Sequence, residues 1–256
     1  MQKKVFVSMI LIGMISTYSC EDEKPDDRNW MSFDGNIEFT VMEYYPDTSV
    51  SEPQLYLIIK TKEYYPCFNY PLITEMSIDD NTITVDILGV DGDIGICATA
   101  FGPATGMQSL NMSTGFYNLV FNYKNKIDIH TIDLTDTTVI VSEISSEFSN
   151  PFNFPYFRYI QKSFTYGCDY SDSTEWICDD FIDSLSQLIQ IEKVHFPDSV
   201  FTPYDYGRDV FLYENDSDFE IAGEFLKSYS ETQIDTLEGI YIFIKSWKNK
   251  TYYSWM

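Results

Sequence analysis

The strongest constraint on this fold is a two-residue alternation of apolar side chains that recurs between residues 34 and 147. Residues 72–78 alternate in this way, Asp79-Asp80-Asn81 supplies a turn, and the alternation resumes over residues 83–87. Such alternation, bounded by turn residues, is typical of half-buried strands and predicts a β-hairpin. The same reasoning predicts further strands at residues 37–44, 55–62, 117–123, 127–134 and 139–144. Many short strands at this spacing predict a β-sandwich over residues 34–147.

A short motif within this region narrows the expected sandwich type. Residues 112–117, Met-Ser-Thr-Gly-Phe-Tyr, place an apolar residue, a glycine and Tyr117 just before a predicted core strand. This order resembles the tyrosine corner of Greek-key sandwiches, although Met112 and Thr114 stand where the motif usually has Leu and Pro. The resemblance implies an immunoglobulin-like Greek-key β-sandwich. That fold by itself implies no activity.

The pattern changes after residue 150, where Pro151 and Pro155 interrupt the alternation. We expect a second, small α+β domain over residues 156–256. A helix is predicted after Ser173, with one apolar face formed by Ile177, Phe181, Leu185 and Leu188. Residues 217–220 form a capping-box pattern that predicts the start of a second helix. Strands are predicted at residues 209–214, 240–244 and 251–255, so the fold class is mainly β with an α+β second domain.

The first nineteen residues have the organisation of a signal peptide. Lys3 and Lys4 precede an apolar run over residues 5–15, which is too short to span a membrane but long enough for a signal-peptide core. Ser19 and Cys20 then resemble the end of a bacterial lipobox, although Thr17 and Tyr18 depart from its usual residues. The resemblance implies cleavage after residue 19 and acylation of Cys20, with fatty acids such as palmitate. The alternative is an ordinary secretory peptide that is cut before Cys20.

An acidic run follows directly behind Cys20. Residues 21–27 read Glu-Asp-Glu-Lys-Pro-Asp-Asp, within a segment over residues 20–33 that we interpret as a linker. This run resembles the export signal of Bacteroidetes-type lipoproteins that reach the outer cell surface. The resemblance implies a lipid-anchored protein in the outer membrane that faces the cell exterior. The expected partner is the membrane itself, to which the lipid on Cys20 attaches the chain. Stable anchoring requires more than one acyl chain.

The formal charge of −24 excludes two classes of partner. Binding to nucleic acid requires clustered Lys and Arg, which this chain lacks, so we expect no nucleic-acid partner. Docking onto anionic lipid head groups is disfavoured for the same reason. Loss of Lys3 and Lys4 with the signal peptide changes the formal charge from −24 to −26.

Four cysteines remain once Cys20 is assigned to lipidation: Cys67, Cys97, Cys168 and Cys178. An even number in an exported chain suggests disulfides, and three pairings are possible. We favour Cys67–Cys97 and Cys168–Cys178, because each pair then lies within one expected domain. The alternatives are a zinc site or a catalytic thiol, but the chain has no Cys-x-x-Cys pair and no tight Cys/His cluster.

No sequence motif indicates catalysis. His130 and His195 are the two histidines, and their separation into different expected domains argues against a Ser-His-Asp or Cys-His device. The acidic segments 91–93, 169–175 and 214–220 do not fit the calcium-binding EF-hand loop. We therefore predict no catalytic residues, no metal site and no cofactor, although paired carboxylates for hydrolysis depend on three-dimensional distances that spacing does not give.

The aromatic content supplies the remaining evidence for function. Trp247, Tyr252, Tyr253 and Trp255 lie close together near the C-terminus, beside a Lys-containing turn. Aromatic faces with polar neighbours suit sugar stacking or protein contact, so these residues form a candidate binding surface. The alternative is a hairpin whose aromatic residues pack on the predicted helices.

Three functional hypotheses follow. The first is a non-catalytic extracellular module that binds a glycan, a peptide or an envelope protein, and we rank it highest. The second is an accessory subunit of an outer-membrane complex. The third is a hydrolase that uses acidic residues in a cleft between the two domains.

Overall fold

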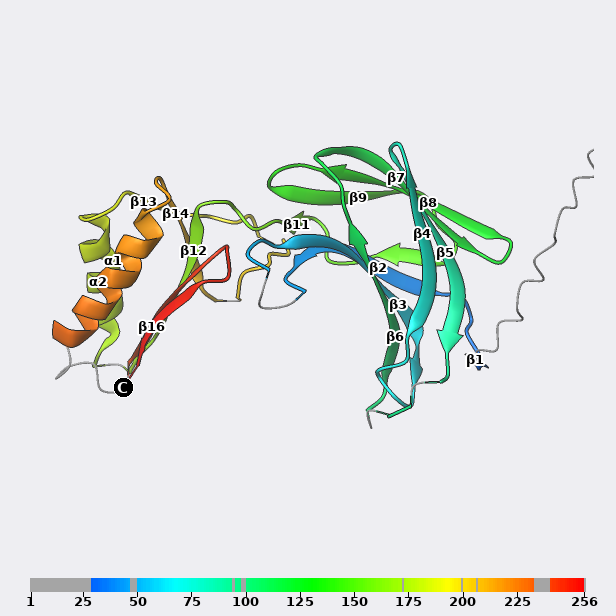
Figure 1. Cartoon of the computed structure of the whole chain (residues 1–256), viewed down its shortest axis with the longest axis horizontal. Helices are drawn as coiled ribbons and strands as arrows, with labels where there is room; N and C mark the ends of the chain where they lie inside the picture. The colour runs from blue at the N-terminus through cyan, green and yellow to red at the C-terminus, as the bar shows by residue number, and fades with distance from the viewer. Residues whose placement is uncertain are drawn as a thin grey trace, which may run out of the picture.

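The computed structural model describes residues 29–46, 50–93, 95–97, 100–171, 173–198, 200–205, 207–232 and 240–255. The predicted signal peptide over residues 1–19, Cys20 and most of the acidic linker lie outside these ranges. The described chain forms two parts that lie side by side along the long axis (Figure 1). The first is built from strands alone, and the second combines strands with two helices. The expectation of a mainly β protein is confirmed.

Two facing sheets make up the first part, which we call the sandwich. Within the described ranges, one sheet contains β1 (Trp30–Met31), β4 (Leu72–Asp79), β5 (Thr82–Asp91), β7 (Gly115–Tyr123), β8 (Lys126–Leu134), β9 (Thr138–Ser145) and β11 (Tyr156–Phe157). The other contains β2 (Ile37–Tyr44), β3 (Gln54–Tyr65), β6 (Gly102–Leu110) and β10 (Ser149–Pro151). Their inward side chains form one core, in which the rings of Phe39 on β2 and Phe121 on β7 lie 4.8 Å apart.

The predicted hairpin over residues 72–87 is confirmed as the pair β4 and β5, whereas the immunoglobulin-like Greek key is not confirmed. That fold consists of two antiparallel sheets. Here β5 and β7 run parallel, as do β10 and β2. The local tyrosine-corner bond is nevertheless present, because the hydroxyl of Tyr117 donates to the backbone oxygen of Ser113 at 2.8 Å.

The sandwich continues beyond residue 147. Strand β10 pairs with β2, and β11 pairs with β9. Phe148 and Tyr156 are buried in the sandwich core, although the sequence pattern placed Tyr156 at the start of the second domain. At the other end, β1 adds Trp30 and Met31, which precede the expected first residue of the sandwich.

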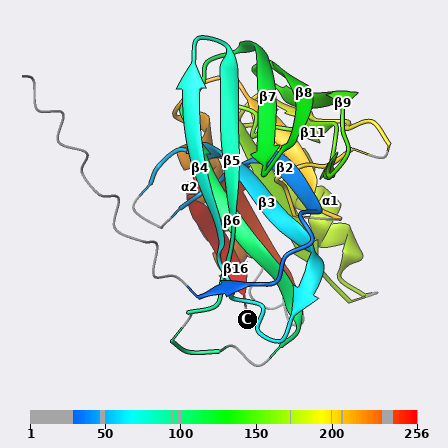
Figure 2. The same cartoon turned by 90° about the vertical axis from the view of Figure 1, so that its right-hand side faces the viewer.

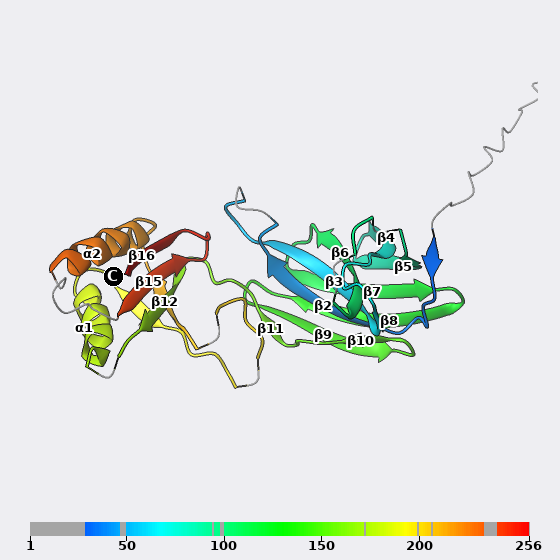
Figure 3. The same ribbon diagram turned by 90° about the horizontal axis from the view of Figure 1, so that it is seen from below.

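The second part is an antiparallel sheet covered by helices. Its described strands lie in the order β13 (Ile191–Lys193), β14 (Asp209–Tyr213), β12 (Ser163–Asp169), β15 (Tyr241–Ser246) and β16 (Thr251–Trp255). Helices α1 (Glu175–Ser186) and α2 (Asp218–Thr232) cover the face of this sheet that is turned away from the sandwich (Figure 3). Among the described residues, no helix combines the length and apolar composition needed to cross a bilayer.

Helix α1 confirms most of the predicted apolar face and corrects its last member. Ile177, Phe181 and Leu185 are buried against the sheet. Leu188 lies beyond the end of the helix and is 57% exposed, while Ile189 is buried in its place. The helix ends at Ser186, so the helical spacing that predicted Leu188 on the same face no longer applies there.

The capping box predicted at residues 217–220 is replaced by another arrangement. Helix α2 begins at Asp218, whose carboxylate accepts the backbone N–H of Asn215 at 2.8 Å. The carboxylate of Glu220 contacts the side chains of Lys250 and Tyr252 on the neighbouring hairpin. Glu220 therefore ties the helix to the sheet.

Candidate functional site

Two inward positions on β8 carry polar side chains. Asp128 and His130 alternate with Ile132 and Leu134, so all four face the core, and both polar residues are almost fully buried. The carboxylate of Asp128 accepts hydrogen bonds from the backbone N–H groups of residues 147, 148 and 149, at 2.8, 2.9 and 2.6 Å. The Ser149 hydroxyl donates to the same carboxylate at 2.7 Å. This cluster fixes the segment that leads into β10.

The cluster contains Ser, His and Asp but lacks the geometry of a catalytic triad. The Ser149 hydroxyl donates its proton to Asp128, so the 2.8 Å contact with His130 requires Nε2–H of the imidazole to donate to Oγ. In a triad the Asp bonds His Nδ1, and the Ser proton points to the imidazole. Here His130 Nδ1 has no hydrogen-bond partner among the described residues. Burial lowers the pKa of His130, and Ser149 is 0% exposed, so the cluster is structural.

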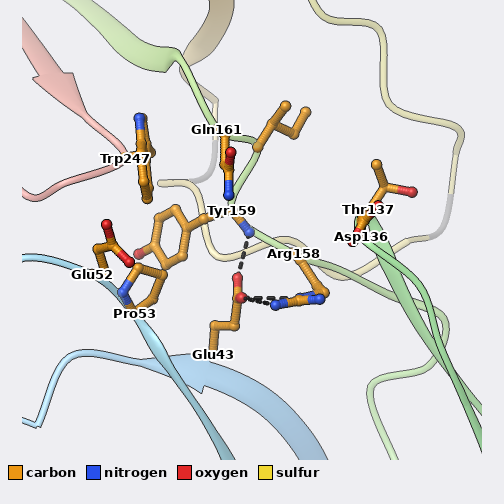
Figure 4. A pocket seen from close by; sticks show the side chains of 10 residues that line it. Glu43, Glu52, Pro53, Asp136, Thr137, Arg158, Tyr159, Gln161 and Trp247 are labelled. Carbon is orange, nitrogen blue, oxygen red and sulfur yellow. Dashed lines mark hydrogen bonds and ion pairs between the residues drawn. The ribbon is translucent and has the colours of Figure 1, made fainter. Parts of the chain in front are cut away.

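A pocket with a volume of about 440 Å³ lies between the sandwich and the second part (Figure 4). That volume falls within the range of ordinary small-ligand sites. Its lining comes from five separate segments: Glu43 on β2, Glu52 and Pro53 before β3, Asp136 and Thr137 between β8 and β9, residues 158–161 between the two parts, and Trp247 after β15. A ligand in this pocket would therefore contact both parts of the chain.

An ion pair occupies the sandwich side of the pocket. The Glu43 side chain is 4% exposed, and its Oε1 lies 2.9 Å from Arg158 Nη2. Its Oε2 accepts the backbone N–H of Tyr159 at 2.6 Å. Arg158 Nη1 also donates to the backbone oxygen of Thr135 at 2.8 Å. Both carboxylate oxygens are thus engaged, and the charges of the pair offset each other.

Burial sets the direction of the Glu43 titration. It raises the pKa of the carboxyl above its ordinary value, and the Tyr159 N–H and Arg158 oppose this shift without reversing it. Two further acids, Glu52 and Asp136, line the pocket from exposed positions. Because Arg158 is paired with Glu43, these two carboxylates give the pocket a negative balance. The lining favours a neutral or cationic ligand over an anionic one.

Two aromatic side chains, Tyr159 and Trp247, also line the pocket, and Tyr159 connects the two parts of the chain. Tyr159 lies between Tyr45 of the sandwich and Tyr204 of the second part, with ring centroids 5.5 and 5.4 Å away. Burial raises the pKa of Tyr159 to about 12, so this phenol stays protonated at neutral pH. Trp247 is 9% exposed and stands near Tyr159, Glu52 and Gln161 (Figure 4). The pocket therefore combines aromatic faces with carboxylate and amide groups.

The predicted aromatic surface is divided by the structure. Trp247 lines the pocket, whereas the ring of Tyr252 packs 5.3 Å from Phe219 of α2, as the alternative interpretation expected. The backbones of Tyr253 and Trp255 pair with β15, and their side chains lie outside the described part of the structure.

The predicted disulfides are both present. Cys67 bonds Cys97 across a separation of 30 residues, and Cys168 bonds Cys178 across 10 residues. The second bridge joins β12 to the first turn of α1. Across the described residues, no group of three His, Cys, Asp or Glu side chains lies close enough to hold a metal ion.

Sequence reasoning did not find the pocket residues other than Trp247. Glu43 did carry a usable signal, because it follows Ile37, Phe39 and Val41 at inward positions of one strand. A carboxylate at an inward position requires a buried partner, but the alternation does not identify Arg158, 115 residues away, as that partner.

No protein-family model, curated protein or solved structure matches this chain.

Proposed function

We propose that the mature chain from Cys20 is an acylated outer-membrane lipoprotein facing the cell exterior, and that it acts as a non-catalytic module binding a glycan in the pocket between its two parts. The carrying observation is the joint lining by Trp247, Tyr159, Glu52 and Asp136. Aromatic rings present flat apolar faces to a sugar ring, and carboxylates accept hydrogen bonds from its hydroxyls. The negative balance favours neutral or amino sugars.

The same proposal includes the finer fold assignment of the sandwich. An immunoglobulin-like ancestry is supported by the Tyr117–Ser113 bond at the predicted tyrosine corner. The parallel pairs described above depart from that topology. The function proposed for the pocket does not depend on this assignment, because a fold carries no ligand specificity by itself.

Export and acylation are supported by the sequence around Cys20 and by the two disulfides, which form in oxidising compartments. The test is mass spectrometry of the N-terminal peptide from cells that express the full chain. We expect diacylglycerol and a fatty acid on Cys20, and loss of both in Cys20→Ser. Protease shaving of intact cells should cleave the protein. Cleavage only after lysis would contradict the outward orientation.

Glycan binding is tested with the disulfide-bonded mature protein on a glycan array, followed by calorimetry of the best ligand. Glu52→Gln and Asp136→Asn change exposed lining residues and should weaken binding about tenfold each, which corresponds to about 1.4 kcal/mol. Trp247→Phe should weaken it further by reducing the stacking area. Trp176→Phe, at a half-exposed position on α1 away from the pocket, is the matched control and should bind like the parent.

Two results would redirect the assignment. Stoichiometric capture of an envelope protein that is unaffected by the pocket variants would support the accessory-subunit alternative. Hydrolysis of array ligands that is lost in Asp136→Asn would support the hydrolase alternative. Glu43 is a poor candidate for that chemistry, because Arg158 and the Tyr159 N–H occupy both of its oxygens.

A further inference from the structure

The end of the sandwich opposite the pocket carries a group of exposed apolar side chains, which we call the apolar tip: Tyr64, Phe68, Ile96 and Phe101. Ile96 is 84% exposed and Phe101 is 78% exposed, more than any other large apolar residue in the described ranges. Tyr64 and Phe68 are 68% and 55% exposed. Exposed apolar groups of this size mark an interaction surface rather than a packed core.

Covalent and hydrogen bonds hold the apolar tip together. The bridge from Cys67 to Cys97 joins the residue before Phe68 to the residue after Ile96. Asn69 Nδ2 donates to the backbone oxygen of Ile96 at 2.9 Å. A Cβ atom placed on Gly102 would lie 2.6 Å from Phe68 Cβ, so the residue after Phe101 lies directly against Phe68. The segments that carry Phe68, Ile96 and Phe101 are therefore held together, and Tyr64 lies beside them because it pairs with Pro103.

The segments that form the apolar tip lack charge. Charged residues make up 22% of the chain, yet none occurs in residues 64–74 or 94–123. Three acidic residues, Glu63, Asp91 and Asp93, precede these two uncharged segments in the sequence. Insertion into a lipid interface requires an uncharged leading surface, and the neighbouring acids favour zwitterionic over anionic head groups.

The chain approaches the apolar tip from its N-terminal side. Strand β1 pairs Trp30 with Asp91 and Met31 with Val90, at the end of β5 that leads into residues 95–101. Figures 1 and 2 both place β1 at this end of the sandwich. Trp30 lies ten positions after Cys20, and a chain of that length reaches at most about 35 Å when fully extended. A lipid on Cys20 would therefore keep the apolar tip close to the bilayer.

We propose that the apolar tip rests in the head-group region of the bilayer to which Cys20 is anchored, and that it prefers zwitterionic lipid there. The inference rests on the proposed acylation of Cys20, and it adds a second, non-covalent membrane contact. Tethering raises the effective concentration of the bilayer around the apolar tip, so a weak intrinsic affinity suffices. Aromatic side chains such as Tyr64 and Phe101 suit this interface, where one side is apolar and the other is wet.

The experiment attaches the mature chain to lipid without relying on cellular acylation. Cys20 is the cysteine left outside the two disulfides, so it can be coupled to a maleimide phospholipid in phosphatidylcholine vesicles. In a Trp30→Phe background, tryptophan is introduced as Phe101→Trp, and quenching by lipids brominated near the head group is measured. We expect several-fold stronger quenching of the added fluorescence than in the control.

The matched control is Phe116→Trp in the same background. Phe116 is 70% exposed and lies at the start of β7, near the turn between β4 and β5 at the other end of the sandwich. Equal quenching at positions 101 and 116 would overturn the proposal, whatever the state of Cys20 in cells. Absence of acyl groups on Cys20 in cells would instead refute the lipoprotein assignment, so the two failures are distinguishable.

Discussion

Replacing Asp128 by Asn tests the view that a buried carboxylate organises the link between β9 and β10. Asp128 is 1% exposed and accepts four hydrogen bonds. Three of the four reach Oδ2, from the N–H groups of residues 148 and 149 and from the Ser149 hydroxyl. The fourth reaches Oδ1 from the N–H of residue 147. An asparagine can preserve the first three through its oxygen, but its NH₂ group then faces the fourth donor.

The expected loss follows from these contacts. A hydrogen bond to a charged group contributes about 1.5–3 kcal/mol and one between neutral groups about 1 kcal/mol, so the three retained bonds weaken by about 1 kcal/mol each. The partly buried N–H of residue 147, left facing another donor, costs about 1–3 kcal/mol. Because neighbouring effects are not additive, we expect Asp128→Asn to lower the free energy of unfolding by about 3–5 kcal/mol at pH 7.

The effect should depend on pH in a defined direction. Burial alone would raise the pKa of Asp128, but the hydrogen bonds from Ser149 and the backbone N–H groups outweigh it and lower the pKa below the ordinary value. The carboxylate therefore stabilises the folded chain above its unfolded pKa of about 3.9, and this contribution is lost as the pH falls through the folded pKa. The difference between parent and variant should be full at pH 7 and shrink below about pH 4.

The assay is urea unfolding with the disulfides intact, followed by far-ultraviolet circular dichroism, together with hydrogen exchange of the amides at residues 147–149. Those amides should exchange faster in Asp128→Asn. Asp133→Asn is the matched control, because Asp133 lies on the same strand at an outward, half-exposed position. We expect the control to stay within about 0.5 kcal/mol of the parent. A change below about 1 kcal/mol in Asp128→Asn, or one independent of pH, would refute the reasoning.

Three further predictions concern other parts of the chain. Arg158→Met should destabilise the chain by about 3–5 kcal/mol at pH 7, because it leaves Glu43 buried and unpaired. Since burial raises the pKa of Glu43, its protonation should reduce this loss near pH 5, and urea unfolding at the two pH values measures the difference. Cys97→Ser removes the bridge that closes 30 residues and should lower the free energy of unfolding by about 4 kcal/mol, whereas Cys178→Ser removes the bridge that closes 10 residues and should lower it by about 3 kcal/mol. The reverse order in urea titrations would contradict the loop-entropy argument. Tyr117→Phe should cost about 1 kcal/mol by losing one hydrogen bond, and an unchanged urea midpoint would show that the corner bond adds nothing.

The sequence predicted strands best where large apolar residues alternate. Strands β2, β4, β5, β7, β8 and β9 lie where the alternation predicted them, because their inward residues include large side chains such as Phe39 and Phe121. Strand β6 was missed because its inward residues include Gly102, Ala104 and Gly106. A Cβ atom on Gly106 would lie 2.8 Å from the backbone oxygen of Leu72, so β4 passes too close for a larger side chain.

The candidate site was less predictable than the fold. Trp247 was selected for its aromatic neighbours in the sequence. Its partners in the pocket come from segments 86 or more residues away, which the local pattern around Trp247 does not indicate. The local pattern at Glu43 and Asp128 indicates buried carboxylates. It does not indicate which donors satisfy them, because those donors lie on loops whose positions depend on the tertiary fold.

The pairing of β2 with β10 and β3 affects how the anchored protein would resist a pulling force. Strand β3 is 12 residues long and spans about 40 Å, so the pocket end and the anchored end of the sandwich are well separated. A ligand pulled away from the cell would load the chain along the strand axes. Strand β1, which pairs through two residues, would detach first and lengthen the tether. The load would then reach β2, which lies between β10 and β3 and pairs with β3 over eight residues. Those hydrogen bonds would be loaded together in shear, an arrangement that resists force far better than unzipping them one at a time.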